Sequence, residues 1–120
     1  VSVPMANIPK LIKRSEEIAK KRGLEMIAFG HAGDGNVHVT FIKGDLPQEE
    51  WDRNLPLAEK ELFDETTELG GCISGEHGIG IKRKKYLASI VDEAQLDLIR
   101  GIKKAFDRNN ILNPGKIVDL

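Results

Sequence analysis

Two short glycine-rich stretches hold all three histidines of the chain, and they are its most chemically capable segments. The first runs from His31 to His38 with the sequence HAGDGNVH, and the second, SGEHGIG, begins at Ser74. Imidazole nitrogens and carboxylate oxygens are the donors that bind borderline divalent ions such as Zn²⁺. The two stretches can share one ion only if the fold brings them side by side.

The first stretch is predicted to be the turn of a β-hairpin. Residues 24–29 form a compact apolar run and residues 37–42 are rich in β-branched and aromatic side chains, so both favour strands. The six residues between His31 and His38 contain two glycines, which permit the positive φ angles of a turn. The two imidazoles would then lie at the feet of the hairpin, where cross-strand neighbours are about 5 Å apart. The alternative is that each histidine packs or hydrogen-bonds locally.

The second stretch places Glu76 in a loop that three glycines leave sterically open. A short strand predicted at residues 72–74 precedes this loop and would lie beside the hairpin, so the Glu76 carboxylate could reach the same ion. Three protein ligands leave a coordination position open for substrate, as in catalytic metal sites. Zn²⁺ suits these donors best, and Mn²⁺ or Fe²⁺ are the alternatives. The competing interpretation is a glycine turn with solvated polar side chains.

The elements around these stretches predict an α+β fold with a ferredoxin-like βαββαβ core. Residues 1–3 alternate as a short strand, and an amphipathic helix is expected over 9–23, closed by a glycine. After the hairpin, a helix is expected over 48–69, kinked or restarted at Pro56, and strand 72–74 follows. Both helices are expected on one face of an antiparallel sheet.

The rest of the chain is predicted to be a loop, one helix and a tail. Asp92 fits the N-cap of a helix from Glu93 to about Phe106. The apolar face of this helix is expected to carry Leu96, Ile99, Ile102 and Phe106. The whole chain would then be one domain, with a core at about residues 1–74 and the active-site loop, helix and tail at 75–120.

Composition narrows the class of protein. The chain has 120 residues, of which 40% are hydrophobic and 31% charged, as expected for one soluble globular domain. Its net charge of -1 indicates no nucleic-acid partner, and no apolar run approaches the roughly 18 residues of a spanning helix. Cys72, the single cysteine, is expected to be buried. The absence of an intrachain disulfide favours the cytoplasm, with peripheral membrane association or an organelle as alternatives.

Three motifs resemble the C-terminal domain of FAD-linked oxidases: HAGDGNVH at 31–38, GGCISGEHGIG at 70–80 and NPGKI at 113–117. This family includes D-lactate dehydrogenases, the glycolate oxidase D subunit and D-2-hydroxyglutarate dehydrogenase, with a vanillyl-alcohol-oxidase type flavin domain. The resemblance covers nearly the whole chain. It implies that the FAD-binding domain lies in a preceding part of the polypeptide, as is also expected for a chain that begins without an initiator methionine.

The resemblance assigns roles in an oxidation. It implies that His31, His38 and Glu76 bind the metal and that His77 is the general base. The parent enzyme would be an FAD-dependent dehydrogenase or oxidase of a small D-2-hydroxy acid, with hydride passing from C2 to the flavin. The 120 residues alone are expected to be inactive, and the electron acceptor stays open.

Further residues receive less defined roles. The resemblance implies that Thr40 faces the substrate, although asparagine can occupy that place in the family. It also implies that Asn113 and Lys116 lie against the flavin domain and contribute to cofactor binding, and the alternative is that they form a plain terminal turn. Asp34 and Asn36 either hydrogen-bond to the metal-binding imidazoles and so fix their tautomers, or form the turn.

Two other functions use the same residues. A free-standing ferredoxin-like module would bind a metal or ligand without catalysis. Alternatively, the three ligands with water in the open position would support metal-assisted hydrolysis. An encoded polypeptide that begins shortly before Val1 would favour the module, and hydrolysis by the purified chain would favour the third hypothesis.

Overall fold

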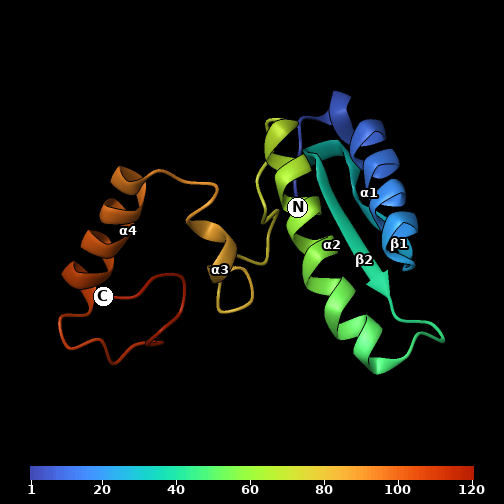
Figure 1. The fold of residues 1–120 in the computed structure, drawn as a ribbon. Helices are drawn as coiled ribbons and strands as arrows, with labels where there is room; N and C mark the ends of the chain where they lie inside the picture. The colour runs from blue at the N-terminus through green and yellow to red at the C-terminus, as the bar shows by residue number, and fades with distance from the viewer. The chain divides into compact units, whose positions relative to one another are not determined.

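The computed structural model describes residues 1–120. It contains two compact units, Val1–Glu76 and His77–Leu120, and each has its own cluster of buried apolar side chains. Figure 1 shows the order of the elements: helix α1, strands β1 and β2 and helix α2 in the first unit, then helices α3 and α4 and a long tail in the second. Helices combine with a small antiparallel sheet, so the predicted α+β class is confirmed.

The predicted hairpin forms, with strands that run closer to the turn than expected. β1 (Glu25–His31) pairs antiparallel with β2 (Asn36–Ile42), and the short 3₁₀ helix η2 (Ala32–Asp34) joins them. The chain can reverse in so few residues because Gly35 takes a left-handed conformation, with φ 77°, at the end of η2. His31 is therefore the last residue of β1 instead of part of the connection.

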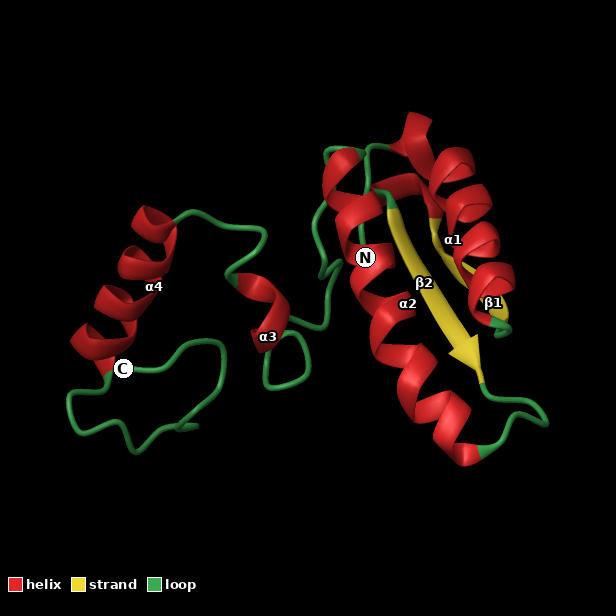
Figure 2. Ribbon diagram, in the orientation of Figure 1, coloured by secondary structure: helices red, strands yellow, loops and turns green.

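Two long helices lie against the hairpin (Figure 2). After the one-turn helix η1 (Met5–Asn7), α1 spans Ile8–Arg22 and ends at Gly23, which is left-handed as its position predicts. α2 spans Gln48–Glu68 without interruption, so Pro56 does not restart the helix. Inside a helix, a proline has no N–H to donate to the carbonyl group four residues earlier, which here belongs to Asp52. Both Asp52 and Pro56 are exposed, so water can bond to this carbonyl group instead.

The core of the first unit lies between these helices and one face of the hairpin. Because side chains alternate along a strand, Met26 of β1 and Val37, Val39 and Phe41 of β2 all face this core. They pack with buried side chains of the two helices: Leu11, Ile18, Ala19, Ala58 and Leu62. The other face of the hairpin carries no helix of this unit. It presents the polar side chains of His31, His38 and Thr40 together with the apolar ones of Ile27 and Phe29.

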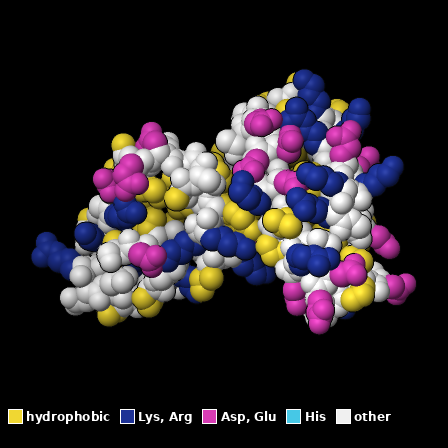
Figure 3. Space-filling model, in the orientation of Figure 1, with side chains coloured by type: hydrophobic (Ala, Val, Ile, Leu, Met, Phe, Trp, Pro, Cys, Tyr) yellow, Lys and Arg dark blue, Asp and Glu magenta, His cyan; other side chains and the backbone are white.

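Charged side chains of both signs mix over α1 and α2 (Figure 3). Arg14 of α1 pairs with Glu65 of α2, and both Lys21 and Arg22 pair with Glu61. Solvent-accessible pairs of this kind each contribute at most about 1 kcal/mol. The buried apolar contacts therefore hold the two helices in place.

The expected four-stranded ferredoxin-like sheet is not confirmed, because only two of its strands form. The outer segments, residues 1–3 and 72–74, contribute only isolated antiparallel bridges, in which Ser2 pairs with Asn36 on one side and Cys72 on the other. A proline without an amide hydrogen follows the first segment, and glycines flank the second, so neither segment extends. From edge to edge, the bridged order is Cys72, Ser2, β2, β1.

The second unit contains α3 (Lys84–Leu87) and α4 (Glu93–Phe106). α4 begins where the sequence predicts, because the Asp92 side chain accepts a hydrogen bond from the backbone N–H of Gln95, and the Gln95 side chain accepts one from Asp92. The buried cluster of this unit joins the two helices to the tail: Leu87, Leu96 and Val118, with Ile79, Val91 and Ile99 against it.

One prediction about burial is wrong, that of Cys72, and the predicted apolar face of α4 is covered only in part. Ile102 and Phe106, which lie on this face, are 52% and 85% exposed. The tail covers α4 only around Leu96. The helical spacing of apolar residues in a sequence predicts an apolar face but not which segment packs on it. Cys72 is also exposed, because its neighbour Ile73 takes the inward position of the alternating backbone.

Asp107 anchors the tail to the end of α4. Its carboxylate pairs with Lys103 and accepts hydrogen bonds from the backbone N–H groups of Ile111 and Leu112, at 3.0 and 2.8 Å. The Lys103 ammonium and these two amides hold the pKa of Asp107 below its ordinary value, although burial opposes them. The same contacts close the turn that follows the helix.

This lowered pKa predicts a pH-dependent stability. Because folding lowers the pKa of Asp107, its contribution to the free energy of unfolding is complete above about pH 4, the ordinary carboxyl range, and disappears as the pH falls through the lowered value. Asp107→Asn should therefore melt at a lower temperature than the unchanged chain at pH 7, and the gap should close below pH 3. Thermal melts from pH 7 to 2 measure this, with Asp45→Asn in an exposed loop as the control. A gap that is constant with pH would contradict it.

Gly71 tests the packing of the N-terminal segment. A Cβ at this position would lie 2.2 Å from the Ser2 carbonyl oxygen and 2.9 Å from Cγ2 of Thr66. Gly71→Ala is therefore expected to lower the free energy of unfolding by about 2 kcal/mol, as overpacking does. Gly33→Ala is the matched control, because nothing lies within 4 Å of its added Cβ. Equal denaturant midpoints for the two variants would show that the segment does not pack as described.

Candidate metal site

His31 and His38 lie on the face of the hairpin that points away from α1 and α2. Residues directly opposite each other in an antiparallel pair share a face. His38 pairs with Phe29 and His31 pairs with Asn36, so the two histidines are diagonal neighbours on one face. Their rings meet edge to face with centroids 6.1 Å apart. The two imidazoles therefore approach each other. Because β1 extends to His31, they are diagonal neighbours and not a directly opposed pair.

Glu76 reaches this face because the chain before it is bonded to the sheet. Cys72 exchanges backbone hydrogen bonds of 2.9 Å in both directions with Ser2, which in turn bridges to Asn36. Gly75 then passes so close to Asn36 that a Cβ on it would lie 2.2 Å from the Asn36 side-chain oxygen. The next residue, Glu76, places its Oε1 3.0 Å from Nε2 of His38.

The three side chains offer donor atoms to one point. One nitrogen each from His31 and His38 and one oxygen from Glu76 all lie within 4.8 Å of one another. In a tetrahedral site with metal–ligand bonds of about 2.0 Å, two ligand atoms lie about 3.3 Å apart. The 3.0 Å between Nε2 of His38 and Oε1 of Glu76 is close to this distance. The residues therefore fit a divalent ion after small side-chain rotations. The His38 and Glu76 side chains are 20% and 45% exposed, so a bound ion would stay open to further ligands.

Phe29 is a site residue that the sequence reasoning missed. Its ring stacks on His38, with centroids 5.1 Å apart and 19° between the planes. This contact fixes the plane of the imidazole and so aims its nitrogen. Side chains alternate between the two faces of a strand, so the sequence could have placed Phe29 on the same face as His31.

The remaining candidates of the first unit take different places. Thr40 is exposed on the same face as His38 and pairs with Ile27. The side chain of Asp34 accepts a hydrogen bond of 3.1 Å from the backbone N–H of Asn36, which is the contact of an Asx turn. Asn36 is buried against Gly75. Of the two roles open for Asp34, its contact supports turn formation.

Three candidates belong to the second unit. His77 is its first residue and is exposed. Asn113 adopts a left-handed φ of 49°, and its carbonyl accepts a 3.3 Å hydrogen bond from the backbone N–H of Lys116. The N–H of Ile117 donates to the Gly80 carbonyl at 2.9 Å, so the third motif lies beside the end of the second within this unit.

Comparison with known proteins defines the class. The family model described as the C-terminal domain of FAD linked oxidases matches residues 1–117. The chain therefore belongs to this family.

Named relatives cover nearly all of the chain. It is 46% identical over 116 residues to a D-lactate dehydrogenase of Archaeoglobus fulgidus, covering 97% of this chain and 25% of that protein. It is 40% identical over 116 residues to the glycolate oxidase subunit GlcD of Bacillus subtilis, covering 97% and 24%. It is 32% identical over 120 residues to a D-2-hydroxyglutarate dehydrogenase of Stutzerimonas stutzeri, covering 98% and 26%. The chain thus spans about a quarter of the length of these relatives. None of its helices is long and apolar enough to cross a bilayer.

The cluster predicts a measurable metal affinity. Glu76→Gln keeps the size of the side chain but removes its charge, so the affinity of the purified chain for Zn²⁺ should fall by at least about 100-fold. Titration against a chromophoric chelator measures the dissociation constant. Glu17→Gln, an exposed carboxylate on α1, is the control and should bind zinc like the unchanged chain. Equal affinities for the two variants would remove Glu76 from the site.

Proposed function

We propose that this chain is the metal- and substrate-binding part of an FAD-dependent enzyme that oxidises a small D-2-hydroxy acid. The observation that carries the proposal is the convergence of His31, His38 and Glu76 on one open face of the hairpin. The names of the relatives support the substrate class, since they act on D-lactate, glycolate and D-2-hydroxyglutarate by those names. The matched family supplies the link to FAD.

The three ligands prepare the hydroxyl group for oxidation. A divalent ion held by them would make the hydroxyl on C2 more acidic, and FAD bound by the rest of the polypeptide would accept the hydride from C2. His31 and His38 contribute neutral donors and Glu76 one negative charge, so the occupied site would keep a net positive charge. That charge suits the carboxylate of a hydroxy acid. Phe29 keeps His38 in one orientation while substrate enters the open side.

His77 completes the reaction in this proposal. It follows Glu76 directly in the chain, and an imidazole accepts a proton readily near neutral pH. Its ring nitrogen would take the hydroxyl proton while the hydride leaves C2, so the alcohol loses two electrons and two hydrogens and becomes a 2-oxo acid. Thr40 would contact the substrate from the same face as His38, and Asn113 and Lys116 would lie against the flavin-binding part.

We also propose that the sheet is a shortened ferredoxin-like one. The bridged order Cys72, Ser2, β2, β1 with every pair antiparallel is the order that such a fold would have. Its outer members are reduced to single bridges, which is enough to position Glu76.

The decisive experiment uses the full-length flavoenzyme. His77→Gln should lower kcat for D-lactate or glycolate by about 10²–10⁴-fold, the usual effect of losing a general base, while zinc and flavin contents stay unchanged. Glu76→Gln should lower both turnover and zinc content. Glu17→Gln is the matched control for the second variant. Steady-state kinetics, metal analysis and flavin absorbance provide the three readouts.

Three results would contradict the proposal. Full turnover after the metal has been removed by a chelator would exclude the metal role. A polypeptide without bound flavin, or one that hydrolyses its substrate, would favour the other functions considered for this site.

A further inference from the structure

β1 is the edge strand of the sheet, and its outer edge has no partner. Its only paired neighbour is β2, and six of its seven residues are exposed. Natural edge strands are usually kept short or blunted by proline, lysine or a bulge, because a bare edge recruits other strands. The strand Glu25–His31 has none of these devices, and its single acidic residue stands at its start.

The hydrogen-bonding groups that face outward can be identified from the other side of the hairpin. The N–H of Val37 donates to the Val1 carbonyl at 2.9 Å, and the Val37 carbonyl accepts a 3.1 Å bond from the amino group of Val1. Val37 therefore points away from β1, so its pair with Gly30 is a non-hydrogen-bonded pair. Such pairs alternate along the ladder. The N–H and C=O groups of Met26, Ala28 and Gly30 consequently point out of the free edge.

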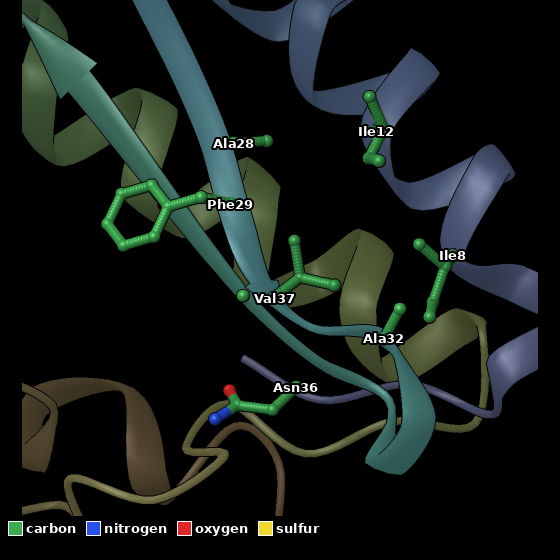
Figure 4. Close-up of a pocket in the computed structure, with 8 residues that line it drawn as sticks. Ile8, Ile12, Ala28, Phe29, Ala32, Asn36 and Val37 are labelled. Carbon is green, nitrogen blue, oxygen red and sulfur yellow. The ribbon is translucent and has the colours of Figure 1, made fainter.

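An apolar pocket of about 130 Å³ lies next to this edge. Figure 4 shows Ile8 and Ile12 of α1 facing Ala28 across it, whereas the ring of Phe29 lies on the far side of the strands. Ala28 belongs to the inward-facing set of β1, yet it is exposed, because nothing continues the sheet beyond it. A strand added at this edge could hydrogen-bond to the N–H and C=O groups of Met26, Ala28 and Gly30. One of its apolar side chains could fill the pocket.

We propose that the free edge of β1 docks a β-strand from the part of the same polypeptide that precedes Val1. The matched family is a C-terminal domain, and the chain spans about a quarter of its relatives, so in them most of the polypeptide lies before this region. A strand beyond β1 would lie three strand spacings from Ser2, about 14 Å, which a short connection can span. The strand pairs with Met26, Ala28 and Gly30 and fills the pocket with one apolar side chain.

The size of the surface favours a segment of the same polypeptide over a second copy. Three residues of strand edge and a small pocket are far below the interface of about 1,000 Å² that a stable association between separate proteins needs. A tethered strand is held at high effective concentration and loses little freedom on docking. This inference depends on the chain belonging to a longer polypeptide but not on the metal.

Amide hydrogen exchange on the full-length protein tests the proposal. With the strand docked, the amides of Met26, Ala28 and Gly30 should exchange about 100-fold or more below their intrinsic rates, as slowly as those of Ile27 and Phe29, which bond within the hairpin. A bare edge would instead give an alternating pattern, fast at 26, 28 and 30 and slow at 27 and 29. That pattern would overturn the proposal.

A second measurement identifies the occupant. Ala28→Pro removes one outward N–H and should raise the exchange rates of Met26 and Gly30 at least tenfold while Ile27 stays slow. Ala28→Ser keeps the N–H and is the control. Protection that increases with protein concentration, together with the mass of a dimer, would assign the edge to a second copy and overturn the proposal. The pattern of the unchanged protein decides the question even if the proline variant does not fold.

Discussion

The candidate site depends on one short piece of backbone, the three residues at the start of the chain. Ser2 is bridged to Asn36 on one side and to Cys72 on the other, and Val1 and Val3 add hydrogen bonds to the hairpin. Residues 36 and 72 are far apart in sequence and have no backbone contact of their own. The N-terminal segment makes them neighbours, and the carboxylate of Glu76 reaches His38 as a result.

Glycines allow this segment to be so closely enclosed. A Cβ on Gly35 would lie 2.1 Å from the carbonyl oxygen of Val3, and one on Gly71 would lie 2.2 Å from that of Ser2. From the sequence alone, the glycines suggested loops that are open to a ligand. In the structure, Gly35 and Gly75 in the two stretches, and Gly71 just before the second, serve mainly to let backbones touch. The open character of the site comes instead from the hairpin face that no helix of the first unit covers.

The sequence predicts the elements of this fold better than their extents. Periodicity and capping residues are local signals, and they placed the helix starting after Asp92 and the end of α1 at Gly23. The ends of strands depend on partners distant in sequence, so the prediction did not extend β1 to His31. Ligand chemistry singled out His31, His38 and Glu76, but the spacing of these residues could not give their diagonal arrangement. The stack of Phe29 on His38 and the exposure of Phe106 likewise depend on neighbours that no local pattern names.

The contact between Gly75 and Asn36 has an evolutionary consequence. Neither residue donates an atom to the candidate metal cluster, yet any side chain at position 75 would occupy the place of the Asn36 amide. Position 75 can therefore gain a side chain only if position 36 changes as well, and a lone replacement of Gly75 would displace Glu76 without touching a ligand. Selection on the chemistry of the cluster is in this way transmitted to two residues that perform none of it. Among descendants of this chain, a side chain at position 75 should appear only together with a smaller residue at position 36, and the length of the loop between 72 and 76 should stay constant.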